Sequence, residues 1–296
     1  MMRRLLPLFL GAAQLSGCSG LSLLNAITPR DGYTLTADIA YGEVDRRRLD
    51  VYAPKPVLAV NPPVIVFVYG GSWDSGDRRD YRFVGEALTR RGYIAVIPDY
   101  RLHPQARYPE FIDDTAAATA WALKHAQRLG GDGRVYLMGH SAGAYNAAMV
   151  AYDPTRTSSL GPARLAGFIG LAGPFDFSPD DTPVTRRVFG SVPDPASTQP
   201  VNLVTAGDPP ALLLHGEDDR TVQPRNSRSL AHRLARVGVP ARLREFPGVG
   251  HVGILLALSP LRRNDPPVLD ELDAFIAAQS KPIPDPAGQE RSGQSP

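Results

Sequence analysis

Ser141 lies in a Gly-x-Ser-x-Gly pattern between two segments of different character. The glycines are Gly139 and Gly143; residues 134–138 form an apolar, strand-like run, and residues 142–151 are rich in small helix-forming residues. A turn that joins a strand directly to a helix is tight, and glycines beside the serine remove Cβ atoms that would collide with neighbouring segments. Such a turn presents the serine hydroxyl at its tip. The pattern therefore predicts that Ser141 is a nucleophile for an acyl group.

A serine hydroxyl is a weak nucleophile until a neighbouring base removes its proton, and that base needs a carboxylate to fix its tautomer. His251 follows a strand-like segment and lies in the glycine-rich stretch Gly248-Val249-Gly250-His251. The acids Glu217, Asp218 and Asp219 follow an earlier strand-like segment. His251 is therefore the expected base. Asp219 and Asp218 both remain candidates for the acid, and Glu217 is the weakest of the three.

Attack on a carbonyl leaves a negatively charged oxygen, which convergent backbone N–H groups can stabilise. Gly70 and Gly71 end the β-branched run 63–69 and supply a turn that can approach the serine. We expect the N–H groups of Gly71, Ser72 and Ala142 to be the donors, with Gly70 leaving room for the backbone. A glycine turn used only for folding is the alternative. This chemistry requires neither a metal nor an organic cofactor.

Apolar runs alternate with amphipathic segments along most of the chain, which predicts an α/β fold with a mostly parallel, twisted sheet and helices on both faces. The first two strands alternate apolar and polar residues, as half-buried antiparallel strands do. Residues 174–209 interrupt the alternation with many prolines, and we expect a small cap over the site, with a simple surface loop as the alternative. The expected strands are 33–41, 48–52, 63–69, 93–97, 134–138, 165–171, 210–214 and 241–246, and the expected helices are 81–90, 111–127, 142–151, 224–237 and 267–278.

The composition fits one large globular domain over residues 31–280. Of the 296 residues, 43% are hydrophobic and 21% are charged, which is ordinary for a globular protein. The formal net charge is only +2 and no long Lys/Arg-rich run is present, so we expect no nucleic-acid partner. The tail 281–296 is polar and rich in Pro and Gly, and is expected to be disordered.

The single cysteine, Cys18, follows a short basic start and an apolar stretch at residues 5–13. Leu15-Ser16-Gly17-Cys18 resembles the lipobox of bacterial lipoproteins. The resemblance implies a signal peptide at residues 1–17, lipidation of Cys18, and a tether at residues 18–30. It also implies export and membrane anchoring, and Ser19 in place of Asp favours the outer membrane, facing the periplasm. An ordinary secretory signal with an incidental cysteine is the alternative.

Four segments between about residues 45 and 280 resemble α/β-hydrolase carboxylesterases, especially the hormone-sensitive-lipase-like and feruloyl-esterase-like ones. There is some likeness to arylformamidases and isoprenylcysteine methylesterases. The segments are Gly-His-Ser-Ala-Gly at 139–143, Tyr-Gly-Gly-Ser-Trp at 69–73, the stretch 99–109, and His-Gly-x-x-Asp-x-x-Val at 215–222. The last of these implies that Asp219 is the acid. Tyr69 departs from the pattern, since the family usually has a histidine there.

The resemblance implies an α/β-hydrolase fold and a serine hydrolase that cleaves small-molecule carboxylic esters through an acyl-enzyme on Ser141. An amide-directed hydrolase of the same fold, such as an arylformamidase or a peptidase, is an alternative. A surface lipoprotein that binds a ligand on a non-catalytic hydrolase scaffold is a second alternative. That reading requires a broken Ser–His–Asp set, whereas this sequence contains all three residue types in the expected order.

Overall fold

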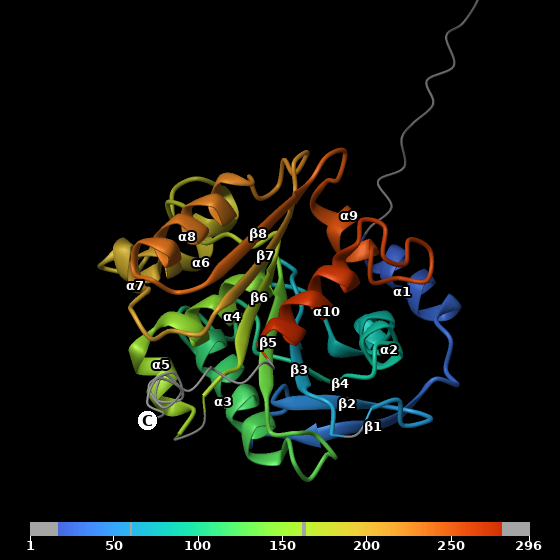
Figure 1. Ribbon diagram of the computed structural model, residues 1–296. Coiled ribbons are helices and arrows are strands. Elements are labelled where there is room, and N and C mark those ends of the chain that lie inside the picture. The colour runs from blue at the N-terminus through green and yellow to red at the C-terminus, as the bar shows by residue number, and fades with distance from the viewer. Residues whose placement is uncertain (1–16, 60, 162–163, 280–296) are drawn as a thin grey trace, which may run out of the picture.

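The computed structural model describes residues 17–59, 61–161 and 164–279, and its centre is a single eight-stranded sheet (Figure 1). The strand order is β1-β2-β4-β3-β5-β6-β7-β8. Strand β2 pairs antiparallel with β1 on one side and with β4 on the other, and all remaining pairs are parallel. The prediction of a mostly parallel sheet is therefore confirmed. The strands are β1 (Tyr33–Ala40), β2 (Arg48–Pro54), β3 (Val64–Val68), β4 (Ile94–Pro98), β5 (Val135–His140), β6 (Gly167–Leu171), β7 (Ala211–Gly216) and β8 (Ala241–Phe246).

Helices cover both faces of the sheet, as predicted. Figure 1 shows α2 and α10 on one face, and α3, α4 and α8 on the other. The helices are α1 (Gly17–Ile27), α2 (Arg82–Arg90), α3 (Glu110–His125), α4 (Ala142–Tyr152), α5 (Pro154–Ser159), α6 (Pro183–Phe189), α7 (Pro200–Leu203), α8 (Arg225–Arg236), α9 (His251–Leu256) and α10 (Val268–Ala278), with 3-10 turns η1 (Arg78–Tyr81) and η2 (Pro195–Thr198).

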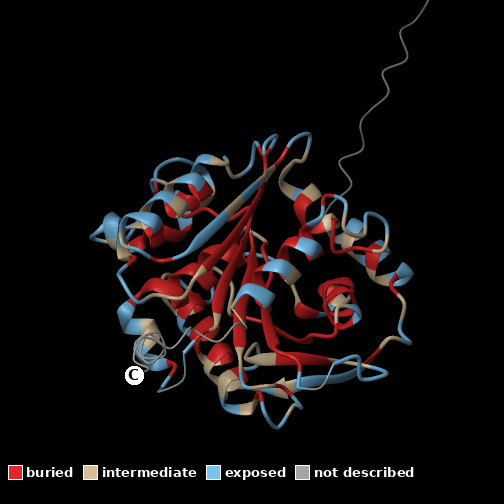
Figure 2. Ribbon diagram, in the orientation of Figure 1, coloured by how far each residue is buried: buried red, intermediate tan, exposed pale blue. Residues whose placement is uncertain are grey.

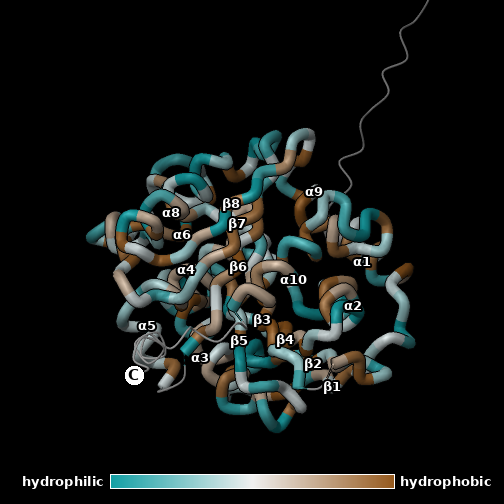
Figure 3. The backbone as a smooth tube through the Cα atoms, viewed as in Figure 1, coloured by the Kyte–Doolittle hydropathy of each residue, from teal (hydrophilic) through white to brown (hydrophobic). Residues whose placement is uncertain are grey.

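The core lies along the inner strands. Every residue of β3, β4, β5, β6 and β7 is buried, as Figure 2 shows in red, because helices cover both faces there. This explains why those strands are continuous apolar runs. The edge strand β8 instead has exposed and half-buried residues up to Phe246. Figure 3 shows the hydrophobic segments gathered in the sheet interior and the hydrophilic ones toward the periphery.

The structure contains helical segments that the sequence prediction did not include. Residues 18–30, expected to be a tether, contain most of helix α1, because Leu24 is buried and Asn25 Nδ2 donates to the carbonyl of Arg79 at 2.6 Å. Residues 174–209 contain α6, η2 and α7, which gives the expected cap a helical framework. His251, expected in a turn, is the first residue of α9.

Two predictions fall outside the described residues. The segment 1–16 of the expected signal peptide and the expected disordered tail from residue 281 onward are not described. Among the helices that are described, none has the length and apolar character to cross a bilayer.

Candidate active site

The turn between β5 and α4 holds Ser141 in an unusual backbone conformation, with φ 55° and ψ −126°. A non-glycine residue rarely adopts a positive φ, so the surrounding structure must enforce it. The flanking glycines make this possible. A Cβ on Gly143 would lie 2.1 Å from the carbonyl oxygen of Val68, and one on Gly139 would lie 2.4 Å from that of Gly143. The helix can therefore pack against the strands only with glycine at both positions.

The structure brings the three predicted side chains together from the segments that follow β5, β7 and β8. His251 Nε2 lies 2.8 Å from Ser141 Oγ, and His251 Nδ1 lies 2.7 Å from Asp219 Oδ2. Because a carboxylate can only accept, Nδ1 carries the proton and Nε2 is free to accept the serine hydroxyl proton. Burial raises the pKa of Asp219, but hydrogen bonds from His215, His251 and the backbone of Val222 outweigh it and hold the pKa below its usual range.

The two candidate acids differ sharply in their surroundings. Asp219 is buried, and its Oδ1 accepts the backbone N–H groups of Thr221 at 2.9 Å and Val222 at 2.8 Å. Asp218 is exposed, and its backbone N–H donates to the carbonyl of Val249 at 3.0 Å. The geometry therefore selects Asp219 as the partner of His251.

His140, the residue before Ser141, supports the base. It is buried, and its Nε2 lies 3.1 Å from the backbone carbonyl of His251, so Nε2–H must donate. Burial, and then the neighbouring His251, lower the pKa of His140 to about 3. His140 is therefore a neutral donor that fixes the start of α9 relative to the Ser141 turn.

The predicted oxyanion donors belong to the glycine loop after β3 and to the first residue of α4, both next to Ser141. No acceptor within the described part of the chain receives the backbone N–H groups of Gly71, Ser72 and Ala142. A Cβ on Gly70 would lie 2.9 Å from Ser141 Cβ, and one on Gly71 would lie 2.2 Å from the carbonyl oxygen of Ser75. Gly70 thus lets the loop approach the serine, Gly71 permits the tight turn of the loop itself, and the available N–H groups suit a developing oxyanion.

A buried network of hydrogen bonds and ion pairs supports the glycine loop, and Tyr69 is part of this network. The Tyr69 hydroxyl donates to Asp99 Oδ1 at 2.6 Å and lies 2.9 Å from Arg46 Nη2. Arg78 Nη1 donates to Asp99 Oδ2 at 2.6 Å, and its Nε donates to Asp50 at 2.9 Å. Tyr69 also stacks on the rings of Tyr81 and Tyr100. The tyrosine that replaces the family histidine therefore has its own fixed set of partners.

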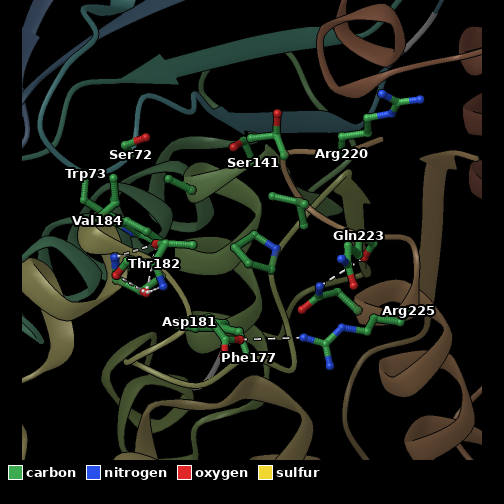
Figure 4. Close-up of a pocket in the computed structure, with 16 residues that line it drawn as sticks. Ser72, Trp73, Ser141, Phe177, Asp181, Thr182, Val184, Arg220, Gln223 and Arg225 are labelled. Atoms are coloured by element: carbon green, nitrogen blue, oxygen red, sulfur yellow. Dashed lines mark hydrogen bonds and ion pairs between the residues drawn. The ribbon is translucent and has the colours of Figure 1, made fainter. Parts of the chain in front are cut away.

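A cavity of about 470 Å³ opens at Ser141. Trp73, Phe177 and Val184 contribute apolar side chains to its lining. Asp181 and Arg225 also line it and form an ion pair at 3.6 Å, drawn as a dashed line in Figure 4. Its size is that of a small-molecule site. Within the described residues, no group of three or more His, Cys, Asp or Glu side chains could hold a metal ion.

Sequence reasoning missed the residues that fix the cavity walls. Trp73 Nε1 donates to Asn146 Oδ1 at 3.0 Å, which anchors the glycine loop on α4. Asn226 Oδ1 accepts the N–H groups of Phe175 and Asp176 at 3.0 and 2.9 Å, which fixes the start of the cap. These pairs are separated by 73 and about 50 residues, and no local pattern signals them.

Comparison with known proteins agrees with this geometry. The model of the BD-FAE family matches residues 49–234, which is more than half of the chain. The chain belongs to the BD-FAE family. The matched segment contains Ser141 and Asp219 but ends before His251, so the structure supplies the third member of the set.

Two relatives with similar sequences are both esterases by name. A probable isoprenylcysteine alpha-carbonyl methylesterase of Arabidopsis thaliana is 29% identical over 243 residues, covering 74% of this chain and 51% of the relative. The esterase LipC of Mycobacterium tuberculosis is 29% identical over 235 residues, covering 72% of this chain and 58% of the relative. The matched region thus spans little more than half the length of these relatives.

Solved structures agree on the α/β-hydrolase fold. A thermophilic esterase of Thermogutta terrifontis with bound butyrate is 25% identical and has a TM-score of 0.68, covering 86% of this chain and 96% of that one. An esterase B from Lactobacillus rhamnosis has a TM-score of 0.74 at 19% identity, covering 88% and 93% of the two chains. The fold prediction is therefore confirmed.

Proposed function

We propose that this BD-FAE protein is a serine hydrolase of carboxylic esters, acting through an acyl-enzyme on Ser141. The observation that carries the proposal is the continuous hydrogen-bonded chain from Ser141 Oγ through His251 to Asp219, beside a cavity and free N–H donors. The esterases among its relatives and structural neighbours support the choice of ester chemistry.

In the first half of the reaction, Ser141 Oγ attacks the ester carbonyl carbon while His251 Nε2 takes the hydroxyl proton. Asp219 stabilises the imidazolium, and the N–H groups of Gly71, Ser72 and Ala142 stabilise the oxyanion. The tetrahedral intermediate then collapses, the bond to the alcohol oxygen breaks, and His251 returns the proton to the leaving alcohol. In the second half, water attacks the acyl-enzyme by the same route and releases the carboxylic acid.

The decisive test compares Ser141→Ala with Ser158→Ala, which changes an exposed serine on α5. We expect Ser141→Ala to abolish hydrolysis of p-nitrophenyl esters and labelling by a fluorophosphonate probe while the fold is kept, and Ser158→Ala to retain both. Full ester turnover by the Ser141 variant would overturn the mechanism. A folded wild-type protein that neither turns over esters nor takes up the probe would instead favour a non-catalytic binding scaffold.

An amide-directed activity is the second candidate, because a kynurenine formamidase of Salmo salar is 25% identical over 142 residues, covering 48% of this chain. Rates on formanilide and on matched phenyl esters, measured with the same enzyme preparation, separate the two. We expect the ester to be cleaved faster. A higher kcat/KM for the formanilide would reassign the reaction class.

We also propose that the protein is exported and anchored through lipidated Cys18, facing the periplasm from the outer membrane. The support is the sequence pattern at residues 15–18. Metabolic labelling with a fatty-acid analogue, followed by membrane fractionation, tests this proposal. We expect the label to disappear in Cys18→Ser and the protein to leave the membrane fraction. An unlabelled wild-type protein would contradict lipidation.

A further inference from the structure

His215 is a buried histidine that the reaction described above does not use. It lies near the end of β7, four residues before Asp219, and is fully buried. Its Nε2 lies 2.8 Å from the carbonyl oxygen of Val222 and 3.2 Å from Asp219 Oδ2. Its Nδ1 lies 2.7 Å from Ser227 Oγ, on the first turn of α8. The ring therefore bridges a strand, the loop that carries the acid, and the following helix.

These contacts determine the tautomer of His215. A carbonyl oxygen and a carboxylate oxygen can only accept hydrogen bonds, so Nε2 must carry the ring proton. Nδ1 then presents a lone pair, and the Ser227 hydroxyl donates to it. Both ring nitrogens thereby have a partner: Nε2–H donates to the carbonyl of Val222 at 2.8 Å, and Asp219 Oδ2 lies 3.2 Å from the same nitrogen.

The carboxylate of Asp219 is consequently surrounded by four donors. Oδ1 accepts the backbone N–H groups of Thr221 and Val222, and Oδ2 accepts His251 Nδ1–H while lying within reach of His215 Nε2–H. Asp219 Oδ2, which accepts the hydrogen bond from His251, is also the oxygen that His215 contacts. A change at His215 thus acts on the orientation of Asp219 and, through it, on the orientation and tautomer of His251.

We propose that His215 is a positioning residue for the reaction, which holds the Asp219 carboxylate in the orientation that aligns His251 and is itself held by Ser227 on α8. The proposal rests on the proposed hydrolase function. His215 is not among the residues that line the cavity, so the effect should fall on kcat and leave KM nearly unchanged.

The test uses His215→Phe and His215→Gln. Phenylalanine keeps the ring shape and removes both nitrogens, whereas the glutamine amide can restore a donor near the position of Nε2. We expect kcat per active site to fall about tenfold in His215→Phe, within the range known for coupled neighbours, and to recover partly in His215→Gln. Active sites are counted by fluorophosphonate titration, so a mere loss of folded protein does not lower this value.

Coupling to Asp219 provides the sharper criterion. In an Asp219→Asn background, His215→Phe should cause little further loss of kcat, because the group through which it acts is already disabled. If the loss of kcat in the double variant equalled the product of the two single losses, the proposal would be overturned. A normal kcat per titrated site in His215→Phe would overturn it as well. Should His215→Phe fail to fold, Ser227→Ala removes only the hydroxyl donor, and we expect a loss of about threefold, on the scale of one hydrogen bond.

A substrate-free readout separates this proposal from the proposed function. The proton between His251 Nδ1 and Asp219 gives a downfield NMR resonance when it is well ordered, and we expect this resonance to weaken in His215→Phe and return in His215→Gln. His125→Gln is the matched control, because His125 lies on α3, contacts Trp121, and should leave kcat and the resonance unchanged. An unchanged resonance in His215→Phe would overturn the positioning role, even if no ester substrate is found.

Discussion

Two loops approach Ser141, one after β3 and one after β7, and different chemistry holds each of them. The β3 loop, which carries Gly71 and Ser72, rests on buried charges, with Asp99 between the Tyr69 hydroxyl and the Arg78 guanidinium. The β7 loop, which carries Asp219, is held by a neutral ring and backbone N–H groups.

The difference follows from the task of each loop. The β3 loop supplies only backbone donors, so charged side chains can hold it from below without facing the reacting atoms. The β7 loop presents a carboxylate whose charge must act on His251, and another full charge beside it would change the electrostatics of the base. Neutral donors orient that carboxylate without competing for it. We therefore expect changes in the β7 loop to affect catalysis, and changes beneath the β3 loop to affect stability.

The largest expected effect is that of Asp219→Asn. An amide NH₂ in the place of Oδ2 forces His251 Nδ1 to accept, which puts the ring proton on Nε2, where it can no longer take the Ser141 proton. We expect kcat to fall by about 10⁴-fold with little change in fold. Steady-state kinetics measures the loss, and circular dichroism checks the fold. Asp218→Asn is the control and should stay within about twofold; a larger loss there would reverse the assignment of the acid.

Removing charge beneath the β3 loop should have the next largest effect, on stability. In Asp99→Asn, Oδ1 can still accept from Tyr69, but the new amide NH₂ faces Arg78 Nη1, so two donors meet. We expect the free energy of unfolding to fall by about 3 kcal/mol, as for other broken buried ion pairs. Urea denaturation measures it.

The control is Asp265→Asn, which breaks a surface pair with Arg262. It should cost less than about 1 kcal/mol. If Asp99→Asn left the stability unchanged and lowered only kcat, the expectation that changes near the β3 loop affect stability and not catalysis would be wrong.

The sequence predicted those parts of the site that depend on local pattern. Gly139, Ser141 and Gly143 could be identified because a strand-to-helix turn requires glycine at those positions, and the clashes that a Cβ would make show the same requirement. The strand 241–246 was predicted with its observed bounds, and most other strands within about two residues. Hydrophobic periodicity and turn residues depend on neighbours that are close in sequence, so both can be recognised in a single sequence.

Long-range contacts could not be predicted. The pairing of Tyr69 with Asp99 spans 30 residues, and that of Trp73 with Asn146 spans 73. Nothing in the neighbouring sequence distinguishes these side chains from unpaired ones. The helix α1 was missed for a related reason: its stability depends on the burial of Leu24 against the domain and not on its own propensity.

The third prediction concerns pH and the β5 turn that lies between the two loops. The pKa of His140 is about 3 in the folded protein and near 6.5 in the unfolded chain. Between these values the unfolded state binds more protons, so the free energy of unfolding should rise with pH from about 3 to about 6.5. His140→Gln removes this titration. Urea denaturation at several pH values should show a flatter dependence in the variant, by a few kcal/mol over the window.

His125→Gln is the matched control, because His125 lies at the end of α3 and is not part of the site. It should leave the wild-type slope unchanged. A His140 variant with the full wild-type slope would show that the acid sensitivity of the protein originates elsewhere.

The smallest expected effect comes from the cap. Arg187 on α6 forms an ion pair with Asp74 in the β3 loop, and both side chains are partly exposed, at 43% and 34%. Solvent screens such a pair, so Arg187→Gln should change the free energy of unfolding by less than about 1 kcal/mol. Because the pair joins the cap to the loop that carries the oxyanion donors, KM should rise, by less than about threefold, and added salt should reduce the difference from wild type.

Arg186→Gln isolates the contribution of that link. Arg186 lies on the same helix, but it pairs with Asp180 inside the cap, where both side chains are more than 60% exposed. Its loss therefore removes a charge without releasing the cap from the β3 loop. Equal KM values for the two variants would mean that cap charge matters and the link does not. A KM change confined to Arg187→Gln would show that the cap helps to position the β3 loop through this partly exposed ion pair, in addition to the buried contacts that hold the loop.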